Sequence, residues 1–546
     1  MTDEQTTTAA PRRNGGDLAV ETLHQAAGIV AHTAQADLIP VAKAGGLSPA
    51  SWWAKVTDTA VVAALEDPAN VSKGLGLKPD YSLKALSAYV VQKRLQVDPV
   101  APEADKARAA LFRSRKWLTN VAPTTPVERS GWAQVPVDHP DMVRYAAADV
   151  LDTAALKRAL AEPAPELLAR ERAVLAAVAR VTETGVLLDG DYVRERLTEV
   201  EGKLAAQAEL LAGMGLDAPG STAKVGDWLE AKGHELPTTE KGNRSVAADV
   251  LEALPSSPEV DALLEWRDHE KTLGTYLRPY LSQVEHGDGR LRPTFQTLGA
   301  ATTGRMSCVR PNLQQVPREG GIRGCIVADP GMMLVSADFS GVELRVFAAL
   351  SGDAQLAGMI RDGLDIHKMV AQTVWGPEAT KAHRYQAKRG VFAWLYGGGL
   401  GTIAKQLDGN PETARQVVSA LTRLTPSGVR WADAIREQVK SQRMPYWRHP
   451  SGRLTHLPHR LPHKAVNLCI QSTARELLVD TLLKWEAGRW GGAPVLPIHD
   501  EVVTTVPEAE AAEATAYLSE CMTTELLGVP ILAEASEPSH RWQDSV

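Results

Sequence analysis

Two aspartates have the clearest capacity for chemistry in this sequence. Asp338 ends the apolar run MMLVSADF at Met332–Phe339, and Asp500 lies in the middle of APVLPIHDEVVTTV at residues 493–506, with Glu501 beside it. The first run predicts a strand, and the second predicts a hairpin that presents an acid at its bend. Carboxylates at the ends of adjacent strands could hold two divalent cations about 3.5–4 Å apart, as two-metal phosphoryl transfer requires.

Each aspartate also has a simpler explanation. Asp338 precedes the helical pattern DFSGVELRVFAAL and could cap its first turn. Asp500 could be an ordinary turn residue. Taken singly, each residue fits its simpler role better, so the prediction of a metal site depends on the segment between them.

That segment contains four residues spaced four apart: Arg384, Lys388, Phe392 and Tyr396. Each step of four advances a helix by about 400°, so the side chains stay on one broad face. A core helix would not normally carry Arg and Lys along its aromatic stripe. The pattern predicts a helix that carries two cations and two aromatic rings on one face, where the cations could meet a triphosphate.

The charges of the chain are unevenly distributed. Its formal net charge is -7, yet no acidic residue occurs from Gln438 to Arg475. A solvated basic face is the simpler interpretation of such a run. Its position between two motifs favours a surface that follows a phosphate backbone. The basic residues of this segment are Lys440, Arg443, Arg448, Arg453, Arg460, Lys464 and Arg475.

Length and composition limit the class of protein. The 546 residues are 44% hydrophobic and 23% charged, which predicts several packed cores in an ordinary folded protein. No run is long enough to span a membrane, and the polar N-terminus lacks the apolar core of a signal peptide. We therefore expect a cytoplasmic protein that does not associate with membranes. The cysteines have no metal-ligand spacing and are expected to be reduced thiols: Cys308, Cys325, Cys469 and Cys521.

The patterns predict more than one domain. From about Leu18 to Leu160, short apolar runs alternate with helical patterns, as in a small α/β unit. The proline-bearing stretch AEPAPE at Ala161–Glu166 predicts a boundary. Helical patterns dominate beyond it, followed by the two strand-like runs. We predict a C-terminal α+β unit whose helices are segregated from a small antiparallel sheet.

From about Leu168 onward the sequence resembles the family A, or DNA polymerase I-like, enzymes. Five segments carry the resemblance in the order that the family shows: Thr302–Pro317, DFSGVELR at Asp338–Arg345, His383–Gly399, Lys464–Leu478 and IHDE at Ile498–Glu501. The resemblance implies a right-hand fold with an antiparallel palm sheet and helical fingers and thumb. It also implies template-directed addition of dNTPs to a primer 3′ end with two Mg²⁺ ions, for which Mn²⁺ can substitute.

The resemblance also implies roles for individual residues. Asp338, Asp500 and Glu501 would be catalytic, with metal held by Asp338, Phe339 and Asp500. Glu343 resembles the family's steric gate against a ribose 2′-hydroxyl, and His367 its β-phosphate contact. A surface glutamate and a structural histidine are the simpler interpretations of these two. The resemblance likewise places Phe392 near the sugar and Tyr396 beside the templating base. Primer-template DNA would be contacted by Arg305, Asn312, Gln314, Asn467, Gln471 and His499.

The N-terminal segment resembles a DnaQ-type 3′–5′ exonuclease of RNase H-like α/β fold. Asp37 matches its second motif, in which Thr33 replaces the usual Asn, and Tyr145 with Asp149 matches its third. A plain amphipathic helix is the other interpretation of the third motif. The first motif, Asp-x-Glu on a strand, is missing, because the adjacent Asp3 and Glu4 have no strand around them. We therefore expect a truncated domain without proofreading activity.

These inferences give a domain layout. We predict a polar tail (residues 1–17), the truncated exonuclease-like domain (18–162) and a polymerase domain (163–546). Within the last, the thumb would span about 170–300, the palm about 301–348 and 465–546, and the fingers about 349–464. We expect a monomeric, bacteriophage-type replication enzyme. A single-subunit RNA polymerase, a DNA polymerase that retains exonuclease activity and a non-catalytic DNA-binding scaffold are the alternatives.

Overall fold

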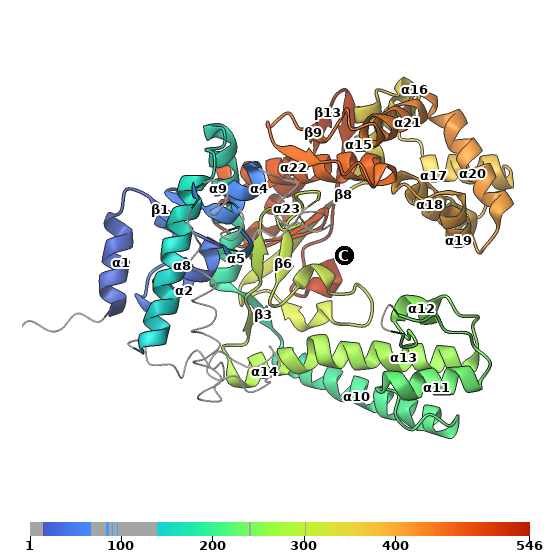
Figure 1. Ribbon diagram of the computed structural model, residues 1–546, viewed down its shortest axis with the longest axis horizontal. Helices are drawn as coiled ribbons and strands as arrows, with labels where there is room; N and C mark the ends of the chain where they lie inside the picture. Colours follow the sequence, from blue (N-terminus) through green and yellow to red (C-terminus); the bar gives the residue numbers. More distant parts are fainter. Residues whose placement is uncertain are drawn as a thin grey trace, which may run out of the picture.

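A four-stranded antiparallel sheet lies at the centre of the molecule, with helical groups on both sides (Figure 1). The computed structural model describes residues 15–66, 83–86, 90, 95–96, 139–239, 242–300 and 302–545. The central sheet has the order β11-β12-β8-β15, and its strands are β8 (Met332–Phe339), β11 (Val495–Ile498), β12 (Glu501–Pro507) and β15 (Ala533–Ala535). β8 and the β11–β12 hairpin match the two runs that the sequence predicts, so this prediction is confirmed.

Helices cover the central sheet and join it to the rest of the chain. The long helix α22 packs against α15, α21 (Pro426–Lys440) and α23, and α23 packs against β8. Their bounds are α15 (Val342–Ser351), α22 (Ala465–Ala487) and α23 (Ala511–Met522). Two hairpins complete this region: β9 (Tyr446–Arg448) with β10 (Leu454–His456), and β13 (Thr524–Leu526) with β14 (Val529–Ile531).

The finger helices lie at one end of the sheet, at the upper right of Figure 1. They are α16 (Ala354–Arg361), α17 (Ile366–Trp375), α18 (Lys381–Leu395), α19 (Leu400–Gln406), α20 (Pro411–Leu424) and α21 (Pro426–Lys440). Phe347 of α15 makes edge-to-face contacts with Trp394 at 5.7 Å and Trp431 at 5.9 Å between ring centroids. Gly428 allows this approach, because a Cβ there would lie 2.7 Å from the Phe347 ring. One aromatic cluster thus joins α15, α18 and α21.

A helical arm extends from the other side, in green at the lower right of Figure 1. It contains α10 (Gly190–Gly213), α11 (Thr222–Ala231), α12 (Ala248–Glu252), α13 (Pro258–Thr272), a π-helical turn (Leu273–Leu277) and α14 (Arg278–His286). The helical patterns expected beyond residue 166 are therefore present, and α13 continues through the π turn into α14. At the base of the arm lies a sheet of order β4-β3-β7: β3 (Val186–Leu188), β4 (Arg290–Leu291) and β7 (Ile326–Val327).

The N-terminal unit contains a parallel pair of strands, β1 (Ile29–Ala31) and β2 (Val56–Asp58). Its helices are α1 (Gly15–Gln25), α2 (Ala34–Ala44), α3 (Ala50–Trp53), α4 (Thr59–Glu66), α5 (Leu83–Leu86) and α8 (Pro140–Ala159). α1 begins inside the segment that was predicted to be a polar tail. Parallel strands with helices between them are the α/β pattern that the sequence indicates.

Helix α9 (Pro165–Thr184) joins the N-terminal unit to the rest of the protein. Leu175 and Ala179 pack into the core of the N-terminal unit. Val174 and Val178, on the same helix, pack into the main core, which also contains the central sheet and the finger helices. Because a helix presents different faces at these positions, a single element belongs to both cores.

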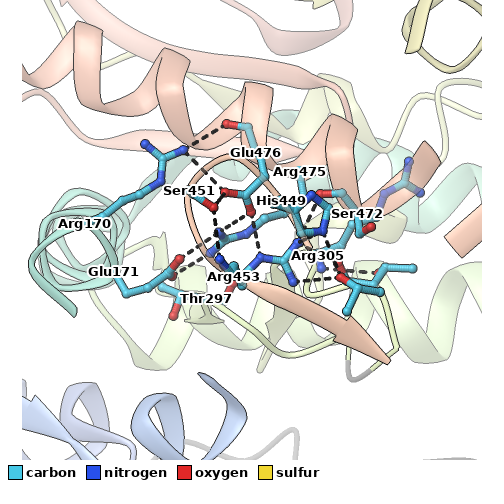
Figure 2. Close-up of polar contacts among 12 residues, drawn as sticks. Arg170, Glu171, Thr297, Arg305, His449, Ser451, Arg453, Ser472, Arg475 and Glu476 are labelled. Atoms are coloured by element: carbon cyan, nitrogen blue, oxygen red, sulfur yellow. Dashed lines mark hydrogen bonds and ion pairs between the residues drawn. The ribbon is translucent and has the colours of Figure 1, made fainter. Parts of the chain in front are cut away.

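A buried ion pair fixes α9 to α22 (Figure 2). Both Glu171 and Arg475 have fully buried side chains, and the two carboxylate oxygens of Glu171 accept hydrogen bonds of 2.7 and 2.6 Å from the guanidinium. Arg475 also pairs with Glu476 at 3.1 Å. The phosphate-following surface predicted for the basic segment is therefore wrong for Arg475 and for Arg453, which are 1% and 3% exposed. Both make internal ion pairs in place of contacts with solvent.

No helix in the described part of the chain is long and apolar enough to cross a membrane.

The Glu171–Arg475 pair gives a stability prediction. Replacing Glu171 by Gln leaves a fully buried guanidinium with only part of its counter-charge, so we expect the free energy of unfolding to fall by about 3–5 kcal/mol. Urea denaturation followed by circular dichroism measures this change. Glu513→Gln is the matched control, because Glu513 pairs with Arg489 at the surface and should have little effect. Equal shifts of the two variants would contradict a structural role for the buried pair.

Candidate active site

The register of the central sheet brings the predicted acids together. Asp338 of β8 is paired with Glu501 of β12, and Glu534 of β15 lies on its other side. Asp500 occupies the two-residue turn between β11 and β12, and its carbonyl oxygen accepts a 3.1 Å hydrogen bond from the Phe339 backbone N–H. Asp338 does not cap α15, whose N-cap position is Gly341. Asp500 is a turn residue, and that turn is placed next to Asp338.

The carboxylates of this cluster repel one another. Burial raises the pKa of Asp338 to about 6, and the negative charges of Asp500 and Glu501 act in the same direction. Asp338 Oδ1 is buried and has no hydrogen-bond partner among the described residues. A partly buried carboxylate oxygen without a donor, next to a second carboxylate, is a donor set suited to a divalent cation.

Two arginines that were not predicted as site residues face these acids. Arg318 Nη2 lies 3.7 Å from Asp338 Oδ2 and 3.8 Å from Glu501 Oε2. Arg323 is buried and holds Glu501 at 3.3 Å. The side chain of Glu501 is therefore neutralised by Arg323, whereas Asp338 faces the exposed Arg318. The stretch PREGGIRGC, with an arginine on each side of a glycine pair, was the available signal.

Within the described ranges, no three His, Cys, Asp or Glu side chains converge as a closed metal site would require. Magnesium typically takes only one or two protein carboxylates and keeps waters or substrate oxygens as its other ligands. Asp338 and Asp500 fit that smaller requirement.

Helix α18 carries the predicted nucleotide contacts on one face. A capping box at Thr380 starts the helix. Lys388 Nζ lies 5.9 Å from the Phe392 ring, and the Phe392 and Tyr396 rings are 5.9 Å apart. The helix ends at Leu395, so Tyr396, the last residue of the predicted pattern, occupies its C-cap position. Gly397 follows at φ 81°, where a Cβ would collide with the His463 carbonyl at 1.8 Å.

His367 of α17 joins this face. Its ring lies 5.6 Å from Phe392, and burial lowers its pKa to about 4, so the imidazole is neutral at pH 7. Its Nδ1 is buried without a partner among the described residues. Arg384 donates from Nε to Asp365 Oδ2 at 2.5 Å. A triphosphate bound here would therefore compete with Asp365 for this guanidinium.

Glu343 connects the central sheet to the finger helices. It lies in the first turn of α15 with a side chain that is 12% exposed. Its Oε1 accepts a 3.2 Å hydrogen bond from Arg305 Nη2, and its Oε2 accepts one of 2.7 Å from the Tyr396 hydroxyl. Burial and the neighbouring carboxylate raise the pKa of Tyr396, which stays a donor. A freely solvated surface glutamate would have neither contact.

The residues predicted to contact DNA divide into two groups. One pocket beside Asp500 is lined by Arg305, Gln314 and His499 among others, and Gln314 Nε2 donates to the Pro497 carbonyl at 3.1 Å. Asn312 caps the 3-10 helix that follows it by accepting from the Gln314 backbone N–H.

Asn467 and Gln471 lie one turn apart on α22, outside the lining of that pocket. The Asn467 Oδ1 atom is buried without a partner among the described residues.

The N-terminal unit brings Asp37 of α2 close to Asp149 of α8. Burial, with the charges of Asp58 and Asp149, raises the pKa of Asp37 to about 6. Sequence reasoning missed Asp58, whose carboxylate accepts from the backbone N–H groups of Thr33, Ala34 and Ala60. Tyr145 lies one turn before Asp149 on α8. The pair Asp3 and Glu4 lies outside the described residues.

Comparisons with known proteins show the family to which the chain belongs. The family model described as DNA polymerase family A matches residues 191–544. The DNA polymerase of Mycobacterium phage D29 is 29% identical over 529 residues, which cover 94% of this chain and 84% of the relative. That of Mycobacterium phage L5 is 26% identical over 541 residues, with 96% and 86% covered. DNA polymerase I of Chloroflexus aurantiacus is 33% identical, over 76% of this chain and 49% of its own.

A solved structure has the same fold. It is the POL domain of Pol1 from M. smegmatis in complex with DNA primer-template and dNTP. The TM-score is 0.67 at 24% sequence identity, with 89% of this chain and 82% of that chain covered.

Proposed function

Because the chain belongs to DNA polymerase family A and is a DNA-directed DNA polymerase, we propose that it extends a primer 3′ end with dNTPs at Asp338 and Asp500. The observation that carries the proposal is the β8–β12 register, which sets an unpartnered Asp338 oxygen beside the Asp500 turn. Enzymes of this family depend in general on divalent metals. The family match favours a DNA polymerase over the RNA polymerase and scaffold alternatives.

The carboxylates of Asp338 and Asp500, with the backbone carbonyl of Phe339, would hold two Mg²⁺ ions, for which Mn²⁺ can substitute. When bound, the ions neutralise charge on the triphosphate and activate the primer 3′ hydroxyl. Glu501 is occupied by Arg323, so we assign it a supporting position behind these ligands.

The finger face would bind the incoming dNTP. Arg384 and Lys388 supply positive charge for the phosphates. A neutral His367 donates a hydrogen bond without adding charge. Phe392 and Tyr396 present rings for the sugar and the templating base. Helix α18 sets the spacing of these groups, so the dNTP is aligned along the helix before the phosphoryl transfer.

Primer-template DNA would lie against the pocket lined by Arg305, Gln314 and His499, with Asn467 and Gln471 on the adjoining helix. Amide and guanidinium groups suit the minor groove, whose acceptors are common to all base pairs. The two mycobacteriophage polymerases match over most of this chain, which supports a role in phage DNA replication.

We propose that this chain has no 3′–5′ exonuclease activity of its own. Asp37 and Asp149 are the two carboxylates that match the exonuclease motifs, and Asp58 is used by three backbone donors. Two-metal cleavage needs further carboxylates.

The first prediction tests the metal ligands. Asp500→Ala should lower the rate of primer extension by at least about 10³-fold, because the lost metal supplies several kcal/mol of transition-state stabilisation. Extension of a 5′-labelled primer measures the rate, and fluorescence anisotropy should show that primer-template binding persists. Asp433→Ala, at an exposed position on α21, is the control. Wild-type rates in Asp500→Ala would exclude the proposed site.

A second prediction concerns sugar selection by Glu343. Glu343→Ala should lower the ratio of kcat/KM for dNTP over NTP by at least about tenfold, a change of 1.4 kcal/mol, because the space for a 2′-hydroxyl opens. Glu343→Gln keeps the bulk of the side chain and should retain most of the selectivity. Glu437→Ala, on the exposed surface of α21, should leave the ratio unchanged. Unaltered selectivity in Glu343→Ala would rule out the gate.

The exonuclease proposal has a direct assay. A 3′-labelled mismatched primer, incubated with the protein and Mg²⁺ but no dNTP, should keep its label. If the label is released and Asp149→Asn prevents the release, the chain retains a working exonuclease site and the proposal is wrong.

A further inference from the structure

The guanidinium of Arg453 lies directly against the backbone of residues 303–304, immediately before Arg305. Arg453 Nη2 lies 3.5 Å from the Thr303 carbonyl oxygen, to which it donates, and 3.1 Å from that of Ser472. Gly304 has φ 70°, and a Cβ at this position would lie 2.5 Å from Arg453 Nη1. The loop therefore rests on the guanidinium, and only glycine allows such close contact without displacement.

Arg453 is itself fixed in place by a buried network. Its Nε pairs with Glu476 Oε1 at 2.7 Å, and Ser451 donates to the other oxygen of that carboxylate at 2.6 Å. Nη1 donates to Thr455 Oγ1 at 3.2 Å. His449 lies 3.2 Å away, and burial, together with the charge of Arg453, lowers its pKa to about 3. The imidazole therefore adds no second positive charge, and the guanidinium keeps one orientation.

The loop that Arg453 supports (residues 303–305) is hydrogen-bonded to Glu343, the proposed sugar-selecting carboxylate. Arg305, the next residue after Gly304, donates to Glu343 Oε1, while Tyr396 holds Oε2. Each oxygen of Glu343 therefore has one donor, from the 303–305 loop on one side and from the finger helices on the other. A displacement of the loop would remove the first donor and leave the second.

We propose that Arg453 is a positioning residue for sugar selection, acting through the 303–304 backbone and Arg305 on Glu343. The inference rests on the proposed role of Glu343 as the gate. Arg453 touches neither substrate nor metal ligand in this scheme. Its planar, forked guanidinium reaches Glu476, Thr455 and two backbone carbonyls together, which the single ammonium of a lysine cannot do.

The test compares selectivity ratios in single and double variants. Arg453→Lys keeps the charge beside Glu476 but loses the fork, so the dNTP over NTP ratio of kcat/KM should fall by about tenfold, the effect of about one charge-assisted hydrogen bond. In an Arg305→Ala background, the same substitution should change the ratio less than about twofold, because the Arg305 side chain, through which Arg453 acts on Glu343, is already absent.

Arg170→Lys is the matched control. Arg170 belongs to the same network, donating to the Glu476 carbonyl at 3.2 Å and to Asp480 at 2.6 Å, and none of its hydrogen bonds within the described residues reaches the 303–305 loop. This variant should keep the wild-type ratio, since a ratio cancels any general loss of active protein. Gly304→Ala disturbs the same contact from the loop side and should lower the ratio even if Arg453→Lys fails to fold.

The outcomes distinguish a failure of the Glu343 gate from a failure of the Arg453 positioning role. If Glu343→Ala leaves selectivity unchanged, the gate itself is wrong and this inference fails with it. If Glu343→Ala lowers selectivity while Arg453→Lys and Gly304→Ala do not, the gate stands and the positioning role is overturned. An equal effect of Arg453→Lys with and without Arg305 also overturns it, because the action would bypass Arg305.

Discussion

The pairing register between β8 and β12 is the constraint on which the rest of the site depends. It sets Asp338 opposite Glu501 and places the β11–β12 turn, with Asp500, at the end of β8. A slip of one residue would turn every side chain of a strand to the other face of the sheet. The buried apolar residues of both strands, among them Val335 and Val502, oppose such a slip. The apolar core thereby holds carboxylates together that would otherwise move apart.

The repulsion between these carboxylates explains the arrangement of cations around the sheet. Arg323 is buried against Glu501 and neutralises it permanently, whereas Arg318 is exposed and more distant from Asp338. The acid that is left without a buried counter-charge is therefore the one with an unpartnered oxygen. A net charge of -7 is compatible with this site, because the local balance at the sheet end differs from the total.

Local patterns predicted the elements better than the partners of their charged residues. Met332–Phe339 and the IHDE hairpin are short, strongly apolar runs, and the structure has both as strands. The burial of Arg453 and Arg475 could not be predicted from the basic segment. Their burial depends on Glu476 and on Glu171, which is 304 positions away from Arg475 along the chain. A run of charges carries no information about counter-charges supplied by a distant helix.

The C-terminal end of α18 also depends on a contact that the local sequence pattern does not predict. The four-residue spacing predicted a helix through Tyr396, whereas α18 ends at Leu395 and Gly397 follows at φ 81°, packed against the His463 carbonyl. This turn leaves Tyr396 at the helix end, where its hydroxyl reaches Glu343. The contact that interrupts the periodicity is therefore also one that completes the site. It comes from tertiary packing, which the spacing of residues on one helix does not encode.

Helix α9 connects the N-terminal unit to the main core through contacts that do not depend on nuclease chemistry. One helix packs into the core of that unit through Leu175 and into the main core through Val178, and it supplies Glu171 to the buried pair. Loss of the packing around Leu175 would therefore loosen the helix that holds Arg475. Arg475 shares the Glu476 carboxylate with Arg453, which lies under the 303–305 loop. The N-terminal unit is thereby connected to the 303–305 loop through buried contacts that involve neither Asp37 nor Asp149.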